Sequence, residues 1–110
     1  LAESLAALML RLKGYRMLAR RFRSPAGEID LIGLRGGLIV VVEVKARSGQ
    51  RARHAIASLG TKQRRRIERA AAFFQAGHPG LENCDIRFDL ITLGPGWLPR
   101  HLPGAWIIGD

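Results

Sequence analysis

An apolar run of five residues, Leu38 to Val42, constrains the fold of this chain more than any other feature. The run continues through β-branched residues from Ile39 to Val42, which favour strands, and it leads directly into Glu43-Val44-Lys45. A run of this length suits one buried strand and falls far short of the roughly 20 residues needed to cross a membrane. The sequence therefore predicts a central strand over 38–46 and no membrane-spanning segment.

The rest of the chain alternates between helical and extended patterns, punctuated by Gly and Pro. A Gly-Gly turn before Leu38 predicts a hairpin with the preceding strand. We expect helices over 1–12 and 61–75, strands over 15–23, 28–34, 38–46 and 85–93, a loop over 94–103 and a short edge strand over 105–108. This order, α-β-β-β-α-β with an optional final strand, predicts an α/β fold in which a sheet is flanked by helices.

A length of 110 residues is typical of one domain, so the sequence predicts a single domain spanning residues 1–110. Residues 47–60 are basic with little periodicity, and we expect a mobile loop there with one helical turn. Cys84 is the one cysteine, which rules out an intrachain disulfide and a cysteine-rich zinc site, and favours a reduced, cytoplasmic protein. We expect surface loops at His54, His78 and His101, a structural ion pair at Asp89, and core or dimer packing at Trp97 and Trp106.

The net charge of +9 is unevenly distributed. Six basic residues and no acid lie between Arg11 and Arg23, and nine basic residues lie between Lys45 and Arg69 with Glu68 as the one acid. Clustered Arg and Lys attract nucleic acid by neutralising phosphates and releasing counterions. Charge alone predicts a phosphate-binding surface, but a solvated basic face remains the alternative, and RNA, DNA and anionic lipid are not distinguished.

The candidate chemistry lies on the two central strands. Side chains alternate between the faces of a strand, so Glu43 and Lys45 share one face, and a hairpin closed at 35–37 brings Asp30 close to Glu43. Two carboxylates between apolar strands need compensation, which a divalent cation such as Mg²⁺ provides. Lys45 then orients a water or stabilises charge on a phosphorane. The alternative is an exposed Glu–Lys strand edge, because an isolated E-x-K is common by chance.

Several short segments together resemble a known family. Asp30 and Glu43-Val44-Lys45 look like the PD-(D/E)xK nuclease signature, in which the proline is often absent, as here. The wider pattern resembles the YraN-like proteins of the UPF0102 family, and it consists of Ala2-Glu3, Gly14-Tyr15, Gly27-Glu28-Ile29-Asp30-Leu31-Ile32, Val42-Glu43-Val44-Lys45-Ala46-Arg47, Lys62-Gln63 and Arg87-Phe88-Asp89. This resemblance implies a restriction-endonuclease-like core similar to Holliday junction resolvases.

The resemblance also implies roles for individual residues. Asp30 and Glu43 would be ligands of Mg²⁺ or Mn²⁺, with the Val44 carbonyl as a third, and Lys45 would be the catalytic lysine. Gln63 would support the catalytic site, and its position four residues before Ile67 places it on the apolar side of its helix. Its alternative is an N-terminal helix residue bonded to free backbone groups.

Glu3 matches a first-helix acid that joins the metal site in the family. Helical spacing instead places Glu3 opposite the leucine stripe of its helix, with Ala7 and Leu10, so either this helix is buried on two sides or Glu3 is exposed. For Glu28, which shares a face with Asp30, we expect a salt bridge at the hairpin edge.

These residues together predict a metal-dependent DNA endonuclease acting on branched or flapped DNA. Residues expected to hold phosphates are Arg20, Arg21, Arg23, Arg47, Arg51, Arg53, Lys62, Arg64, Arg65 and Arg66. A homodimer is expected by resemblance, because two cuts need two sites. Two alternatives remain at this point: a nucleic-acid-binding module that does not cut, and an assembly protein whose basic face contacts another protein.

Overall fold

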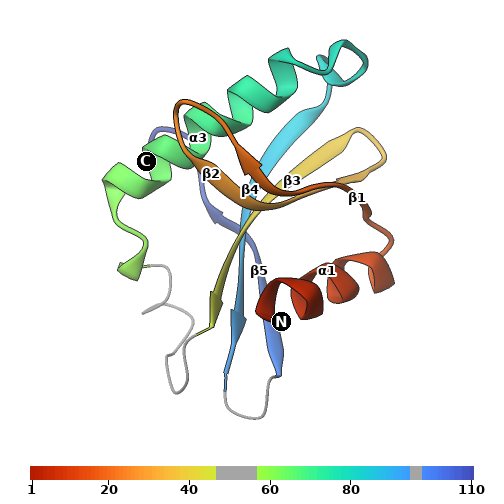
Figure 1. The fold of residues 1–110 in the computed structure, drawn as a ribbon, viewed down its shortest axis with the longest axis vertical. Helices are drawn as coiled ribbons and strands as arrows, with labels where there is room; N and C mark the ends of the chain where they lie inside the picture. Colours follow the sequence, from red (N-terminus) through yellow and green to blue (C-terminus); the bar gives the residue numbers. More distant parts are fainter. Residues whose placement is uncertain (47–56, 95–97) are drawn as a thin grey trace.

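The computed structural model describes residues 1–46, 57–94 and 98–110, which form a five-stranded sheet with one long helix on each face (Figure 1). The elements follow the chain as α1 (Ala2–Leu12), β1 (Arg16–Arg23), β2 (Glu28–Arg35), β3 (Leu38–Ala46), α3 (Thr61–Ala76), the 3-10 turn η1 (Pro79–Leu81), β4 (Asp85–Leu93) and β5 (Pro99–Trp106). The predicted α-β-β-β-α-β order and the mixed α/β sheet are confirmed.

The strands lie in sequence order across the sheet. The β3–β4 pair is parallel and the other pairs are antiparallel. A parallel pair needs a long crossover connection, and α3 provides it by carrying the chain from the end of β3 back to the start of β4. The tight Gly36-Gly37 turn closes the β2–β3 hairpin, as the sequence predicted, with Gly36 at a φ of 59°.

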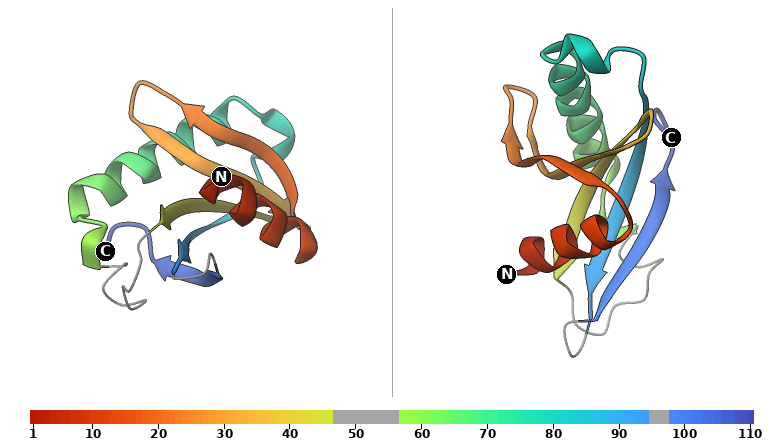
Figure 2. Two further views of the ribbon diagram at one scale, coloured as in Figure 1. Left: turned by 60° about the horizontal axis from the view of Figure 1, so that its bottom comes forward. Right: turned by 90° about the vertical axis from the view of Figure 1, so that its right-hand side faces the viewer.

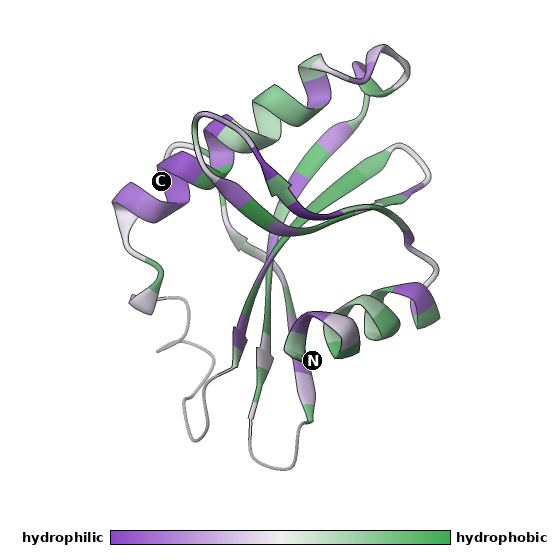
Figure 3. Cartoon of the chain, in the orientation of Figure 1, coloured by the Kyte–Doolittle hydropathy of each residue, from purple (hydrophilic) through white to green (hydrophobic). Residues whose placement is uncertain are grey.

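The apolar run in β3 divides its side chains between two cores. Ile39 and Val41 pack in the cluster that includes residues of α3, whereas Val40 and Val42 pack in the cluster that includes residues of α1. This alternation places the two helices on opposite faces of the sheet, as the two views in Figure 2 show. Figure 3 shows that β3 is hydrophobic along most of its length, whereas the N-terminal half of α3 is strongly hydrophilic.

One sequence prediction about segment boundaries is wrong. The predicted loop over 94–103 is too long, because β5 begins at Pro99. Its prolines are tolerated because β5 is an edge strand, and the register shift opposite Phe88 to Leu90 places Gly104 at a φ of 61° within a bulge. Within the predicted basic segment 47–60, Ala57 and Ser58 are helical, in agreement with the helical turn expected there, and Leu59 is fully buried. Residues 47–56 lie outside the described residues.

Of the core or dimer packing expected for two tryptophans, Trp106 shows core packing, and Trp97 lies outside the described residues. Trp106 stacks on Phe88 at 5.2 Å between ring centroids, and its indole N–H donates to the carboxylate of Glu68 at 3.0 Å. No helix in the described parts of the chain is long and apolar enough to span a bilayer.

Candidate active site

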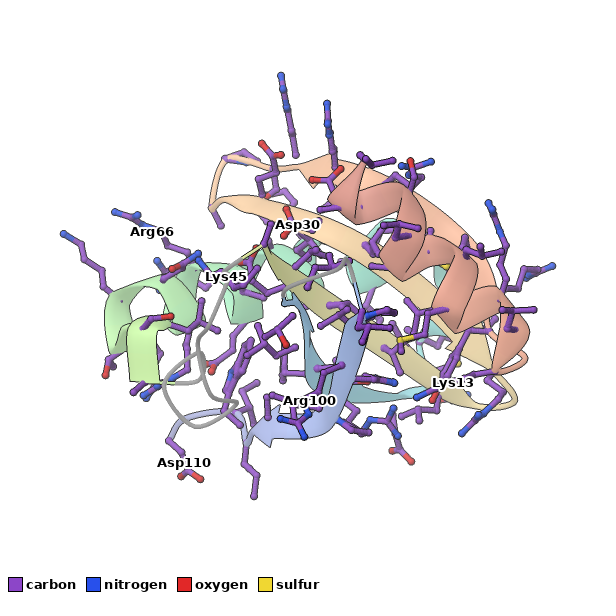
Figure 4. All side chains as sticks on the ribbon, turned by 90° about the horizontal axis from the view of Figure 1, so that it is seen from below. Lys13, Asp30, Lys45, Arg66, Arg100 and Asp110 are labelled. Carbon is purple, nitrogen blue, oxygen red and sulfur yellow. The ribbon has the colours of Figure 1, made fainter. Side chains whose placement is uncertain are left out.

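The hairpin strands β2 and β3 separate at the rung where two carboxylates would face each other. Their pairing runs from Arg35 and Leu38 to Leu31 and Val42, so Asp30 and Glu43 would form the next pair. Like charges directly opposite each other destabilise a strand pair. The ladder ends there, and the backbone N–H of Val44 donates instead to Oδ2 of Asp30 at 2.8 Å. Asp30 is thereby fixed at the fork between the strands, near the end of β3 that carries Lys45 (Figure 4).

Glu43 lies beside Asp30 and is half-buried. Burial, a hydrogen bond to Asp30 and the negative charge of Asp30 together raise the pKa of Glu43 to about 9. The charge of Lys45 and the hydrogen bond from Gln63 act in the opposite direction. The raised pKa favours the protonated form of Glu43 at neutral pH, because a second negative charge this close to Asp30 would be repelled.

Gln63 connects α3 to this carboxyl pair. Its Nε2 donates to Oε2 of Glu43 at 3.1 Å, so the helical arithmetic that directed Gln63 toward the sheet is confirmed. The sequence did not predict Glu43 as the hydrogen-bond acceptor of Gln63. Helical spacing indicates which face of a helix a residue occupies, but it does not indicate which strand residue lies opposite. Asp30, Glu43, Lys45 and Gln63 thus come together from β2, β3 and α3, although they span 34 residues of sequence.

The residues at this site fit a hard divalent cation. The raised pKa of Glu43 beside Asp30 marks a place where positive charge is favoured, and Mg²⁺ commonly binds through one or two carboxylates with waters and phosphate oxygens completing its shell. The described residues contain no group of three or more His, Cys, Asp or Glu side chains arranged around one point. The fit therefore rests on Asp30 and Glu43, with the Val44 carbonyl on the same stretch of β3.

The structure places Glu3 against Arg21 rather than against the carboxyl pair. Glu3 accepts from Nε of Arg21 at 2.8 Å, and this hydrogen bond and the charge of Glu3 raise the pKa of Arg21. Arg21 has a φ of 52°, in the left-handed region that non-glycine residues rarely adopt. The charges of Glu28 and Asp30 also act on Arg21, so this guanidinium lies within the field of the site.

Some of the other residues predicted to bind phosphates already have hydrogen-bond or ion-pair partners, and others have none among the described residues. Arg20 donates to Ser4 at 3.0 Å, and Arg23 lies 3.5 Å from Glu28 in the hairpin-edge salt bridge that the sequence predicted. Arg64 and Arg65 both donate to the backbone carbonyl of Asp110.

Arg64 also donates to the Leu59 carbonyl, and Arg65 donates to the buried carboxylate of Glu68 at 2.9 Å. By contrast, Lys62 and Arg66 are exposed and have no described partner. Arg47, Arg51 and Arg53 lie outside the described residues.

A second polar cluster lies on the α1 face of the sheet, away from the carboxyl pair. Asp89 is fully buried and accepts from Arg87, from Nε2 of His101 at 2.8 Å and from the Gly104 amide at 3.0 Å. Burial alone would raise the pKa of Asp89, but these hydrogen bonds and the charge of Arg87 lower it overall. The predicted ion pair at Asp89 is confirmed.

The prediction of a surface loop at His101 is wrong. Its side chain is 3% exposed, and β5 places it against Asp89. The sequence analysis missed this contact because the prolines around His101 concealed the strand.

Comparison with known proteins gives the chain a family. The family described as "Uncharacterised protein family UPF0102" matches residues 2–93, which include every predicted site residue. This chain belongs to the UPF0102 family. Among UPF0102 relatives, a protein of Paramagnetospirillum magneticum is 52% identical over 111 residues, covering 97% of this chain and 84% of the relative.

A UPF0102 protein of Parvibaculum lavamentivorans is 51% identical over 105 residues, covering 96% of this chain and 77% of the relative. A UPF0102 protein of Maricaulis maris is 45% identical over 109 residues, covering 99% of this chain and 84% of the relative. The predicted family is confirmed.

Proposed function

We propose that this UPF0102 protein is a metal-dependent DNA endonuclease that hydrolyses phosphodiester bonds, with branched or flapped DNA as its expected substrate. One observation carries the proposal: the carboxyl groups of Asp30 and Glu43 lie together with Lys45 and Gln63 at the fork between β2 and β3. Such a group suits phosphodiester hydrolysis, because it offers hard oxygen ligands for a cation and an ammonium for an anionic transition state.

Each residue has a distinct role in this proposal. Asp30 and Glu43, with the Val44 carbonyl, would hold Mg²⁺ or Mn²⁺, which when bound polarises the phosphodiester and lowers the pKa of a water. Lys45 positions the attacking water or stabilises the charge that develops on the phosphoryl oxygens as the phosphorus–oxygen bond to the leaving group breaks. Gln63 is a positioning residue, since it holds Glu43 through a side-chain hydrogen bond.

The expected substrate accounts for the charge of the chain. A clustered basic surface attracts the DNA backbone, and the carboxyl pair would hold the divalent cation. A homodimer, which paired cuts across a junction would require, stays a prediction that light scattering of the purified protein tests.

Cleavage of a substrate panel tests the proposal. We expect labelled flap or four-way-junction DNA to be cut with Mg²⁺ or Mn²⁺ and to remain intact with EDTA, and we expect Asp30→Asn to abolish cutting. Asp85→Asn is the matched control, because Asp85 is an exposed aspartate at the opposite end of β4 from the rung that pairs with Lys45. Salt-sensitive binding without cutting of any substrate would instead favour a non-catalytic nucleic-acid-binding module.

A further inference from the structure

One face of α3 carries a straight row of side chains that the catalytic proposal leaves unused. Lys62, Arg66, Arg69 and Phe73 follow one another at intervals of four, three and four residues, so all four project from the same side of the helix. We call these four residues the α3 stripe. All are exposed, with Phe73 at 53%, although an exposed Phe of this size is uncommon.

The cations of the α3 stripe are free, in contrast to the arginines beside them. Arg64 and Arg65 are held by backbone carbonyls, whereas Lys62, Arg66 and Arg69 have no described hydrogen-bonding or ion-pair partner. An Arg without an internal partner keeps its whole planar donor set for a phosphate. Figure 4 shows Arg66 extending outward from α3 on the side of the molecule that also carries Asp30 and Lys45.

Two hollows follow this side of α3 in succession. The first, of about 310 Å³, is lined by Arg66 with Gly27, Glu28, Gln63 and Ile67, and it adjoins the catalytic group because Gln63 also donates to Glu43. Glu28 carries the one negative charge in this lining, and Arg23 balances it at 3.5 Å.

The second hollow, of about 390 Å³, lies further along the helix. Its lining is Arg69 and Phe73 with three alanines, Ala26, Ala72 and Ala76. It therefore combines one cation with an apolar, aromatic wall, which is the composition that receives an unpaired base rather than a phosphate.

The dimensions of the α3 stripe suit a short length of one strand. Lys62 and Arg69 are seven residues apart, or about 10.5 Å along the helix axis at 1.5 Å per residue. A row of this length can contact a few successive phosphates of one strand; the rise of about 3.4 Å applies to a strand stacked in a duplex, and a more extended unpaired strand covers the row with fewer nucleotides. Phe73 lies one helical turn beyond Arg69 and offers its ring at the end of the cation row.

We infer that the α3 stripe binds an unpaired DNA strand leading away from the catalytic carboxyl pair, with Lys62, Arg66 and Arg69 on its phosphates and Phe73 stacked on a base. This inference rests on the proposed function and narrows its substrate to DNA with an unpaired segment beside the cut. A base within a duplex is already stacked on its neighbours, so only an unpaired base can use the ring of Phe73.

Fluorescence anisotropy in EDTA tests the inference without depending on cleavage. We expect Phe73→Ala to weaken binding of a labelled 12-nucleotide single strand by about tenfold, within the range for one base stacked on an aromatic ring. Binding of a blunt duplex should change less than twofold, and Phe73→Trp should restore single-strand binding. Leu12→Ala is the control, since Leu12 is 80% exposed on α1.

Salt titration tests the cations separately. Arg66→Ala combined with Arg69→Ala should reduce the slope of log K against log salt for the single strand by about 1.4, or about 0.7 for each phosphate that is no longer neutralised. Arg11→Ala, which removes an exposed arginine of α1, should leave the slope unchanged. Thermal unfolding of each variant verifies that the fold is retained.

Either of two results overturns the inference: single-strand binding that is unaffected by Phe73→Ala, or an equal loss for single strand and duplex. The proposed function fails independently, because it requires cutting with Mg²⁺ or Mn²⁺. A protein that cuts DNA but lacks the Phe73 effect contradicts only the strand path along α3. A protein that loses single-strand binding on Phe73→Ala but cuts no DNA contradicts only the proposed nuclease activity.

Discussion

Asp30 and Glu43 occupy facing positions on β2 and β3, yet no rung joins them, and Asp30 accepts the backbone N–H of Val44 at 2.8 Å instead. The carboxylate thereby replaces the strand partner that Val44 lacks where the hairpin opens. Asp30 consequently stabilises the fold in addition to its proposed role in binding the cation. Substitutions at this position can separate the structural role from the catalytic one.

Asp30→Asn and Asp30→Ala should differ in stability but agree in activity. The amide oxygen of Asn still accepts from Val44, whereas Ala leaves that N–H without its acceptor at a cost of about 1–2 kcal/mol in the free energy of unfolding. Both variants lack the carboxylate, so we expect neither to cut DNA. Urea denaturation beside a cleavage assay measures both effects. Equal stability of the two variants would show that the Val44 bond contributes nothing.

Glu43 makes stability depend on pH in a direction that is unusual for a carboxyl group. Its native pKa is about 9 and its ordinary value is 4.5, so the unfolded chain releases the proton first and the stability contribution of this group falls as pH rises from about 4.5 to 9. Gln is an isostere of protonated Glu and cannot titrate.

We therefore expect Glu43→Gln in EDTA to raise the melting temperature at pH 8 by about 5 °C or more, and to change it little at pH 4.5. Thermal unfolding across this pH range provides the measurement. Parallel melting curves for the two proteins at all pH values would contradict the raised pKa.

Lys45→Ala should separate cleavage from binding. Lys45 shares a strand face with Glu43 and contributes one charge among many cations, so its removal should abolish cutting while DNA affinity in EDTA falls less than threefold, about 0.65 kcal/mol. Lys45→Arg keeps the charge but replaces the compact ammonium by a planar fork, and we expect it to restore binding without full cleavage. A Lys45→Ala protein that cuts at the normal rate would remove this residue from the reaction.

Asp89→Ala should destabilise the fold without involving the candidate site. It leaves Arg87, His101 and the Gly104 amide without their shared acceptor, and removing one partner of a buried ion pair costs about 3–5 kcal/mol. The pKa of Asp89 is lowered, so its contribution is present above the ordinary value of 3.8 and disappears as pH falls through the native value.

Urea denaturation at pH 7 measures this destabilisation, with Asp85→Ala as the exposed aspartate of the same strand. A similar destabilisation of the two variants would mean that the Asp89 cluster adds nothing beyond an ordinary surface contact.

Arg64→Ala combined with Arg65→Ala should weaken the fold more than it weakens DNA binding. Arg65 covers the buried carboxylate of Glu68, and both arginines hold the carbonyl of Asp110. We expect the free energy of unfolding to fall by about 2 kcal/mol or more, because among the described residues Glu68 then keeps the Trp106 N–H as its single partner. A salt slope of DNA binding that falls by about 1.8, or about 0.9 for each phosphate, would instead place both guanidinium groups on phosphates.

The sequence could predict the parts of this site that periodicity controls. Alternation along β3 places Glu43 and Lys45 on one face, helical spacing turns Gln63 toward the sheet, and the Gly36-Gly37 turn sets the hairpin register. Other features depend on where separate elements meet. The Glu3 pair with Arg21 requires the angle between α1 and β1, which no local pattern contains.

Most of strand β5 was not predicted from the sequence because of its prolines. Pro99 and Pro103 argue against a strand from composition alone, although an edge position removes the objection because one side of the strand needs no hydrogen-bond donor. The contact between His101 and Asp89 was missed with that strand.

The fork between β2 and β3 requires the two arms of the hairpin to have equal length. Asp30 and Glu43 face each other because equal numbers of residues separate each of them from the Gly36-Gly37 turn. A single inserted residue on either side of the turn would rotate one carboxylate to the opposite face of the sheet, whereas one residue on each side would restore the match of register while moving the pair away from the turn. Natural variation in this hairpin should therefore occur as compensated changes in both arms, and an engineered single insertion should separate the carboxyl groups without altering either of them.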